Sequence, residues 1–276
     1  MALWPFGKKK EDDAAAHTSA EMETQPVDET IDLVGKNLTD NEAAFEGDDD
    51  DLLAPDPIHD AVEGESGPFD GDTVAFEDFD FSDFGQGALN LGSLLIPLPH
   101  GSEVQVEMGP EGPSMLHILT QYGRCTPVAF AAPRSPGQWR ETVRELSEDM
   151  RSQGLEVTIE YGPWGREIVG SREDGGGIVR ILGVDGPRWM LRMTLAAPTE
   201  HADAMAQLGR EITARTFVYR GSEPILAGTS LPVALPQPLA EQVQKEMERR
   251  QRAQNQAQTT AQGFPNNPSP FGTPGN

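Results

Sequence analysis

The feature of this sequence that most constrains its fold is the uneven distribution of its acidic residues. Residues 1–90 contain 25 acidic and four basic residues, and so carry −21 of the chain's total charge of −24. Residues 91–276 are close to neutral, with 20 acidic and 17 basic residues. The acidity therefore belongs to an N-terminal arm, and a folded domain is expected in the near-neutral remainder.

The arm, residues 1–87, is rich in Asp, Glu, Gly and Pro and shows no sustained period of 2 or 3.6. Such a composition buries too little apolar surface to offset the loss of chain entropy, so we predict a disordered acidic arm. Part of the arm alternates aromatic and acidic residues, and its aromatic members include Phe76, Phe79, Phe81 and Phe84. This alternation is typical of segments that dock on a partner or on their own domain. The alternative interpretation is that these rings lead into the first strand and cover an edge of the sheet. The two interpretations have equal weight.

Residues 88–235 show short apolar runs separated by turn residues, which predicts an α+β domain with a largely antiparallel sheet of about six to eight strands. The short connections between the runs favour antiparallel pairing. Gly162-Pro163 and Asp185-Gly186-Pro187 are predicted hairpin turns. The predicted strands are 103–108, 115–119, 127–131, 155–161, 164–169, 178–184, 188–195 and 217–219.

The clearest predicted helix follows the third strand. Ser135 is its expected N-cap, and Gly154 is its expected left-handed residue at the C-terminus. Its apolar residues recur at i, i+4, i+7 and i+11, namely Trp139, Val143, Leu146 and Met150. This helix should lie on the sheet with its tryptophan buried.

Two more helices are predicted further along the chain. One runs from Thr199, as N-cap, to about Arg215 and packs on the sheet through Met205. Residues 236–254 form a short amphipathic helix with an apolar stripe of Leu239, Val243 and Met247. Residues 255–276 are rich in Gln, Asn, Pro and Gly, and are predicted to be a disordered tail.

No catalytic, metal-binding or cofactor-binding residues are predicted. Cys125 is the single cysteine, which fits a reducing compartment, and it is expected to be a small buried residue. None of the five histidines belongs to a metal-ligand motif, and His117 is expected to be a satisfied residue of the sheet. Gly175-Gly176-Gly177 lacks the Lys-Ser/Thr pair of a phosphate loop.

Four arginines lie on predicted strands, namely Arg166, Arg180, Arg188 and Arg192. They would make either a positive face or cross-strand ion pairs with nearby glutamates. Ion pairs are the more economical interpretation because Glu156, Glu160 and Glu167 lie nearby on adjacent predicted strands.

Charge and hydropathy restrict the partners and the location. The negative arm and near-neutral domain argue against nucleic acid, because binding to phosphates requires Lys and Arg. No run approaches the roughly 20 apolar residues that cross a bilayer, so no transmembrane segment is predicted and a cytoplasmic location is expected. Thr24 and Thr30 lie in acidic contexts, and we hypothesise that a Ser/Thr kinase modifies one of them.

The motif Val184-Asp185-Gly186-Pro187-Arg188-Trp189, together with Ala131-Ala132-Pro133-Arg134 and Tyr161-Gly162-Pro163-Trp164-Gly165, resembles the actinobacterial family catalogued as domain of unknown function 3710. The resemblance covers about residues 88–250 and implies an actinobacterial host and a cytoplasmic location, with no catalytic residues. The order of elements is also similar to the PsbP-like fold, a sheet covered by helices whose members mainly bind other proteins.

The leading hypothesis is a non-enzymatic interaction or adaptor protein with an unidentified protein partner. In it the aromatic part of the arm and the Leu239 to Met247 helix bind the partner or regulate the domain. The alternative is a small-molecule-binding or hydrolytic domain whose pocket lies between sheet and helix. Such a pocket would use scattered residues such as Arg188, Trp189 and His117.

Overall fold

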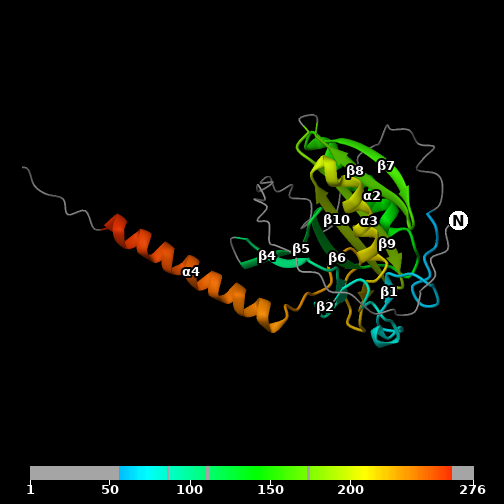
Figure 1. The fold of residues 1–276 in the computed structure, drawn as a ribbon, viewed down its shortest axis with the longest axis horizontal. Coiled ribbons are helices and arrows are strands. Elements are labelled where there is room, and N and C mark those ends of the chain that lie inside the picture. Colours follow the sequence, from blue (N-terminus) through cyan, green and yellow to red (C-terminus); the bar gives the residue numbers. More distant parts are fainter. Residues whose placement is uncertain (1–55, 86, 110–111, 173–174, 263–276) are drawn as a thin grey trace, which may run out of the picture. The chain divides into compact units, whose positions relative to one another are not determined.

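The computed structural model describes residues 56–262 apart from residues 86, 110–111 and 173–174. The predicted α+β class is confirmed: two sheets combine with the helices α2 (Gln138–Ser152), α3 (Ala202–Thr213) and α4 (Gln237–Gln262) (Figure 1). None of the helices in the described part of the chain is both long and apolar enough to cross a membrane.

The larger sheet has seven strands in the order β4-β5-β6-β10-β9-β8-β7, and every neighbouring pair is antiparallel. The predicted hairpins form at β7–β8, around Pro163 and Trp164, and at β9–β10, around Pro187 and Arg188. The strands are β4 (Glu103–Gly109), β5 (Gly112–Thr120), β6 (Gly123–Ala131), β7 (Glu156–Gly162), β8 (Gly165–Ser171), β9 (Ile178–Gly186) and β10 (Trp189–Ala197).

A second, smaller sheet was not predicted. Its order is β1-β11-β3-β2, formed by β1 (Phe69–Asp70), β11 (Phe217–Val218), β3 (Leu94–Leu98) and β2 (Gly87–Asn90). β1 and β11 pair in parallel, and the other pairs are antiparallel. Two-residue strands carry no periodic pattern, so the sequence signal for this sheet is weak.

The structure corrects the prediction of disorder for residues 56–85. The amide of Gly67 donates to the carbonyl of Ala214 at 2.9 Å, and that of Phe69 donates to Thr216 at 2.8 Å. The short helix η1 (Phe76–Asp78) follows β1. This segment gains its apolar burial from β11, far along the chain, which local composition does not reveal. Residues 1–55, with Thr24 and Thr30, lie outside the described residues.

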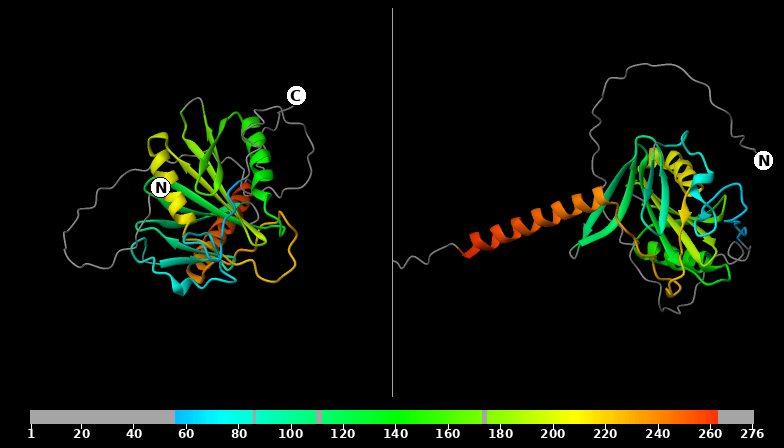
Figure 2. Two further views of the ribbon diagram at one scale, coloured as in Figure 1. Left: turned by 90° about the vertical axis from the view of Figure 1, so that its right-hand side faces the viewer. Right: turned by 90° about the horizontal axis from the view of Figure 1, so that it is seen from below.

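The helices α2 and α3 cover opposite faces of the larger sheet (Figure 2). A Cβ atom on Gly183 would meet the ring of Trp139 on α2, whereas one on Gly209 of α3 would meet Leu195. Gly183 pairs with Arg192 on β10. Residues 192 and 195 are an odd number of positions apart, so their side chains point to opposite faces. The buried core of Ile118, Met193, Leu195 and Met205 lies on the α3 side.

The helix boundaries differ from the prediction in three places. α2 begins at Gln138 rather than after Ser135, although Gly154 adopts the predicted left-handed conformation with φ +83°. Thr199 does not cap α3, because it begins the short helix η2 (Thr199–His201) that precedes it. α4 extends to Gln262, beyond the predicted end at residue 254, because its run of Gln, Ala, Glu and Arg favours helix.

Candidate functional site

The motif around Asp185 holds the fold together. Asp185, on β9, accepts hydrogen bonds from the backbone amides of Gly137 at 2.8 Å and Trp139 at 3.0 Å. These amides belong to the first turn of α2, whose free N–H groups need acceptors. Burial raises the pKa of the Asp185 carboxyl, and the two hydrogen bonds oppose that shift. The acceptor that Ser135 was expected to provide at the start of α2 is therefore provided by Asp185 of β9.

Trp189, in the same motif, joins the two sheets. Its ring is fully buried, and its Nε1 donates to Oδ1 of Asp70 on β1 at 3.1 Å. A Cβ atom on Gly186 would lie 2.2 Å from this ring, so the position requires glycine. Arg188 occupies the hairpin turn with φ +62°. The motif that carries the family resemblance is thus explained by packing, capping and turn geometry.

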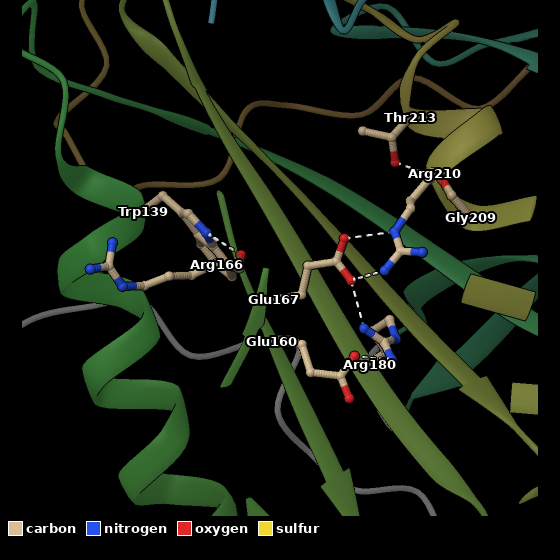
Figure 3. A network of polar contacts seen from close by, with 8 residues as sticks. All are labelled: Trp139, Glu160, Arg166, Glu167, Arg180, Gly209, Arg210 and Thr213. Atoms are coloured by element: carbon tan, nitrogen blue, oxygen red, sulfur yellow. Dashed lines mark hydrogen bonds and ion pairs between the residues drawn. The ribbon is translucent and has the colours of Figure 1, made fainter. Parts of the chain in front are cut away.

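A buried carboxylate connects three strands to α3 (Figure 3). Glu167 on β8 is 2% exposed and accepts hydrogen bonds from Nε and Nη2 of Arg210 at 2.8 and 2.6 Å. Nη1 of Arg180, on β9, donates to the same carboxylate at 2.6 Å, and its Nη2 bonds Glu160 on β7 at 2.8 Å. The hydrogen bonds to Glu167 raise the pKa of Arg210. This network is the cross-strand ion pairing that the sequence favoured.

The other three arginines do not form a single positive face. Arg166 pairs with Asp56, and its guanidinium lies 5.9 Å from the centre of the Tyr161 ring. Arg192 packs over Phe130 at 4.9 Å, and burial lowers its pKa to about 10. Arg188 donates to the carbonyl of Gly221 at 3.2 Å. Each of them is held by a different part of the fold.

His117 is 4% exposed and both of its ring nitrogens have partners. Nδ1 lies 2.7 Å from Oγ1 of Thr126, and Nε2 lies 3.0 Å from Oε2 of Glu107. The neighbouring Ile118 pairs with Cys125, which pairs with Leu195. By strand alternation Trp189 shares the face of Leu195, so His117 lies on the opposite face. The structure therefore does not bring His117 and Trp189 into one pocket.

Cys125 is the buried residue that the sequence predicted. Its side chain is fully buried, and its sulfur lies 3.5 Å from that of Met193. Burial raises the pKa of the Cys125 thiol to about 12. Since the thiolate is the reactive form of cysteine, this position favours the inert thiol.

The four candidate phenylalanines of the arm lie on the protein's own domain. The rings of Phe76, Phe79 and Phe81 surround Phe217 of β11, with centroid distances of 5.3, 5.5 and 6.3 Å. Phe84 lies 4.4 Å from the guanidinium of Arg215. The rings are partly buried, while the intervening acidic residues Glu77, Asp78, Asp80 and Asp83 are exposed. The aromatic residues of this segment therefore pack on the domain, and the acidic residues between them face solvent.

The predicted apolar stripe of α4 becomes less buried along the helix. Leu239 packs against the hydrophobic core, Val243 is partly buried and Met247 is 37% exposed. α4 contacts β4 of the larger sheet. Its polar residues pair within the helix, as in Arg252 with Glu248 at 3.3 Å. The first residue of the stripe thus packs on the domain, and the last is exposed to solvent.

The surface of the described residues includes open hollows, among them one of about 390 Å³ and one of about 380 Å³. The first is lined by Tyr122 and by Leu208 of α3, and the second by Ile58 and by Trp164 at the β7–β8 turn. His117, Arg188 and Trp189 line neither hollow. Among residues 56–262, where described, no three metal-ligating side chains come together.

Comparison with known proteins gives a family but no function. The model of one family, described as "Protein of unknown function (DUF3710)", matches residues 67–242, which confirms the family resemblance. The curated proteins contain no match to this chain.

Two solved structures show weak similarity to this chain. One is a protein of Bacteroides thetaiotaomicron VPI-5482, with 13% identity over 51% of each chain and a TM-score of 0.33, so the chain spans about half of its length. The other is cyanobacterial PsbP (CyanoP) from Synechocystis sp. PCC 6803, with 9% identity over 49% of this chain and 95% of that one and a TM-score of 0.31. At these TM-scores neither likeness carries a functional argument.

Proposed function

Since the chain belongs to the DUF3710 family of proteins of unknown function, we propose from its own geometry that it is a non-enzymatic protein-interaction, or adaptor, protein. Its docking element is α4. The observation that carries the proposal is the stripe of Leu239, Val243 and Met247, which is anchored on the core at one end and exposed at the other.

The length of α4 supports this role. Helices gain most of their stability from packing an apolar face rather than from intrinsic propensity. α4 has 26 residues, and Leu239 in its first turn packs on the core. Apolar residues spaced by four form the face that amphipathic helices insert into grooves of partner proteins. A partner groove that accepts Val243 and Met247 would extend the packing of α4 beyond its first turn.

The buried polar groups fit the same role. Asp185, Glu167 and His117 each bond to other parts of the fold, and the Cys125 thiol is held in its neutral form. These contacts give the domain a rigid frame from which α4 is presented. A buried free thiol also suits the reducing cytoplasm, where we place the protein.

The test is cross-linking and affinity purification from native cells with the full-length protein and two charge-matched variants. Val243→Glu places a carboxylate in the apolar stripe, whereas Gln244→Glu adds the same charge at the next, exposed position. We expect the wild type and Gln244→Glu to capture the same partners, and Val243→Glu to lose them. Equal capture by all three proteins would refute the role of α4. The small-molecule alternative would be favoured by a thermal shift of several degrees with a metabolite.

A further inference from the structure

The two edges of the seven-stranded sheet are built differently. At one edge, β4 has a register irregularity between Glu107 and Met108 and contacts α4. At the other edge, β7 pairs with β8 without a break over all seven residues, from Glu156 to Gly162 (Figure 1). Irregularities and covering helices are the usual ways to block an exposed edge. β7 therefore retains the regular geometry to which another strand can be added.

The pairing of β7 with β8 defines which of its backbone groups face outward. Gly162 and Gly165 flank a two-residue turn, so they form a hydrogen-bonded pair. Hydrogen-bonded and non-hydrogen-bonded pairs alternate along an antiparallel ladder. The N–H and C=O groups of Val157 and Ile159 consequently point away from β8. These two residues present the donors and acceptors that an added strand would use.

Apolar surface adjoins this edge. Tyr161 is 54% exposed and Ile58 is 88% exposed. Tyr161 pairs across the ladder with Arg166, and Arg166 forms an ion pair with Asp56. Asp56 is followed in the chain by Pro57, which lines the hollow of about 380 Å³. Ile58 and Trp164 line this hollow. The edge and the hollow therefore form one continuous surface at the β7–β8 turn.

Acidic side chains surround the same surface. Glu156 and Glu160 are exposed on β7, and Asp60, Glu63 and Glu65 are exposed in the segment that forms the hollow. Antiparallel pairing of β7 with β7 of a second copy would bring Glu156 and Glu160 close to their counterparts, and like charges in such positions destabilise a sheet. A strand with Lys or Arg at alternate positions would instead form opposite-charge pairs.

We propose that β7 binds an extended, basic segment of another protein as an added strand, with an apolar side chain of that segment in the hollow beside Trp164. This inference rests on the proposed interaction function and adds to it a second surface, separate from α4, with a defined class of partner. Backbone hydrogen bonds to β7 hold the segment, and the acidic side chains select its charge.

The test uses fluorescence anisotropy with the full-length protein and a fluorescein-labelled peptide of alternating Lys and Val that ends in Leu. Two control peptides are compared: one with Glu in place of Lys, and one with the same charges but with N-methyl groups on alternate backbone nitrogens. The N-methylated control is necessary because the acidic chain attracts any cationic peptide. We expect each control peptide to bind at least tenfold more weakly than the Lys/Val peptide.

Two protein variants locate the site. Ile159→Pro removes one outward N–H from β7 while leaving the donors that face β8, and Ile58→Glu changes an exposed side chain beside the hollow. Circular dichroism should show both variants folded, and both should bind the Lys/Val peptide at least fivefold more weakly than the wild type. Val243→Glu on α4 should bind it normally, so failure of this inference is distinguishable from failure of the proposed function. Equal binding of the N-methylated peptide, or unchanged binding by Ile58→Glu, would overturn the proposal.

Discussion

The interior of the seven-stranded sheet and its periphery use charged and apolar residues in opposite ways. Inside, Glu167 and Asp185 are held by hydrogen bonds from α3, β9 and α2. On the periphery, Met247 of α4 and Tyr161 of β7 expose apolar surface beside charged neighbours. The comparison teaches that the sequence-specific motifs of this chain stabilise the domain, whereas its exposed apolar residues are the surfaces that we propose for binding. Substitutions in the two regions should therefore have separable effects.

The largest expected effect comes from the buried carboxylate. Glu167→Ala leaves Arg180 and Arg210 without their shared partner, and breaking a buried ion pair typically costs about 3–5 kcal/mol. Urea denaturation should show this loss in the free energy of unfolding. Glu160→Ala is the control: because the Glu160 side chain is 50% exposed, its loss should cost about 1 kcal/mol or less. Similar values for the two variants would contradict the description of the interior.

The next effect tests the packing of α2 on the sheet. A Cβ atom on Gly183 would lie 2.1 Å from the ring of Trp139, so Gly183→Ala forces the helix or the strand to move. Such overpacking costs about 1–3 kcal/mol. Gly87→Ala is the matched control because its Cβ would meet no atom within 4 Å, and thermal denaturation should show it within about 0.5 kcal/mol of the wild type. A neutral Gly183→Ala would show that α2 packs differently.

A smaller effect comes from the cap of α2 and depends on pH. The amides of Gly137 and Trp139 bond to different oxygens of Asp185, and Asp185→Asn replaces one of these oxygens with an NH2 group that cannot accept, so the variant should lose one hydrogen bond and about 1 kcal/mol at pH 7. Burial raises the pKa of Asp185 above its ordinary value of 3.8, so its protonation favours the folded state. The stability of the wild type relative to the variant should therefore rise as the pH falls through the raised pKa, and level off below 3.8. Urea titrations at several pH values measure this difference, and a decrease on acidification would contradict it.

The smallest expected effect on stability lies on the periphery. Val243→Glu changes a partly buried residue of α4 beyond the anchor at Leu239, so the free energy of unfolding should change by about 0.5 kcal/mol or less. Urea denaturation of the full-length variant checks this expectation. A loss comparable with that of Glu167→Ala would mean that the stripe belongs to the core, and the distinction between interior and periphery would fail.

Periodicity and turn residues predicted the class of the fold well. The alternation in residues 103–108 predicted β4, and the spacing of apolar residues from Trp139 to Met150 predicted α2. The smaller sheet was missed because β1 and β11 are short and meet only through contacts distant in sequence. For the same reason composition alone assigned residues 56–85 to the disordered arm.

The site was less predictable than the fold. Sequence spacing identified the α4 stripe. It could not show that Asp185, on β9, caps α2 or that Glu167 binds Arg210 of α3. It also could not show that β7 ends the sheet, because strand order depends on pairings between distant segments. The exposed Ile58 and Tyr161 come together only in the folded chain.

Hydrogen–deuterium exchange of the full-length protein, free and bound to its captured partner, tests the central claim most directly. The account predicts new protection of backbone amides in α4 around Val243 and Met247, or in β7, with unchanged exchange in the buried strands β9 and β10. Protection confined to the hollow lined by Tyr122 and α3, with none in α4 or β7, would contradict the assignment of binding to these peripheral elements.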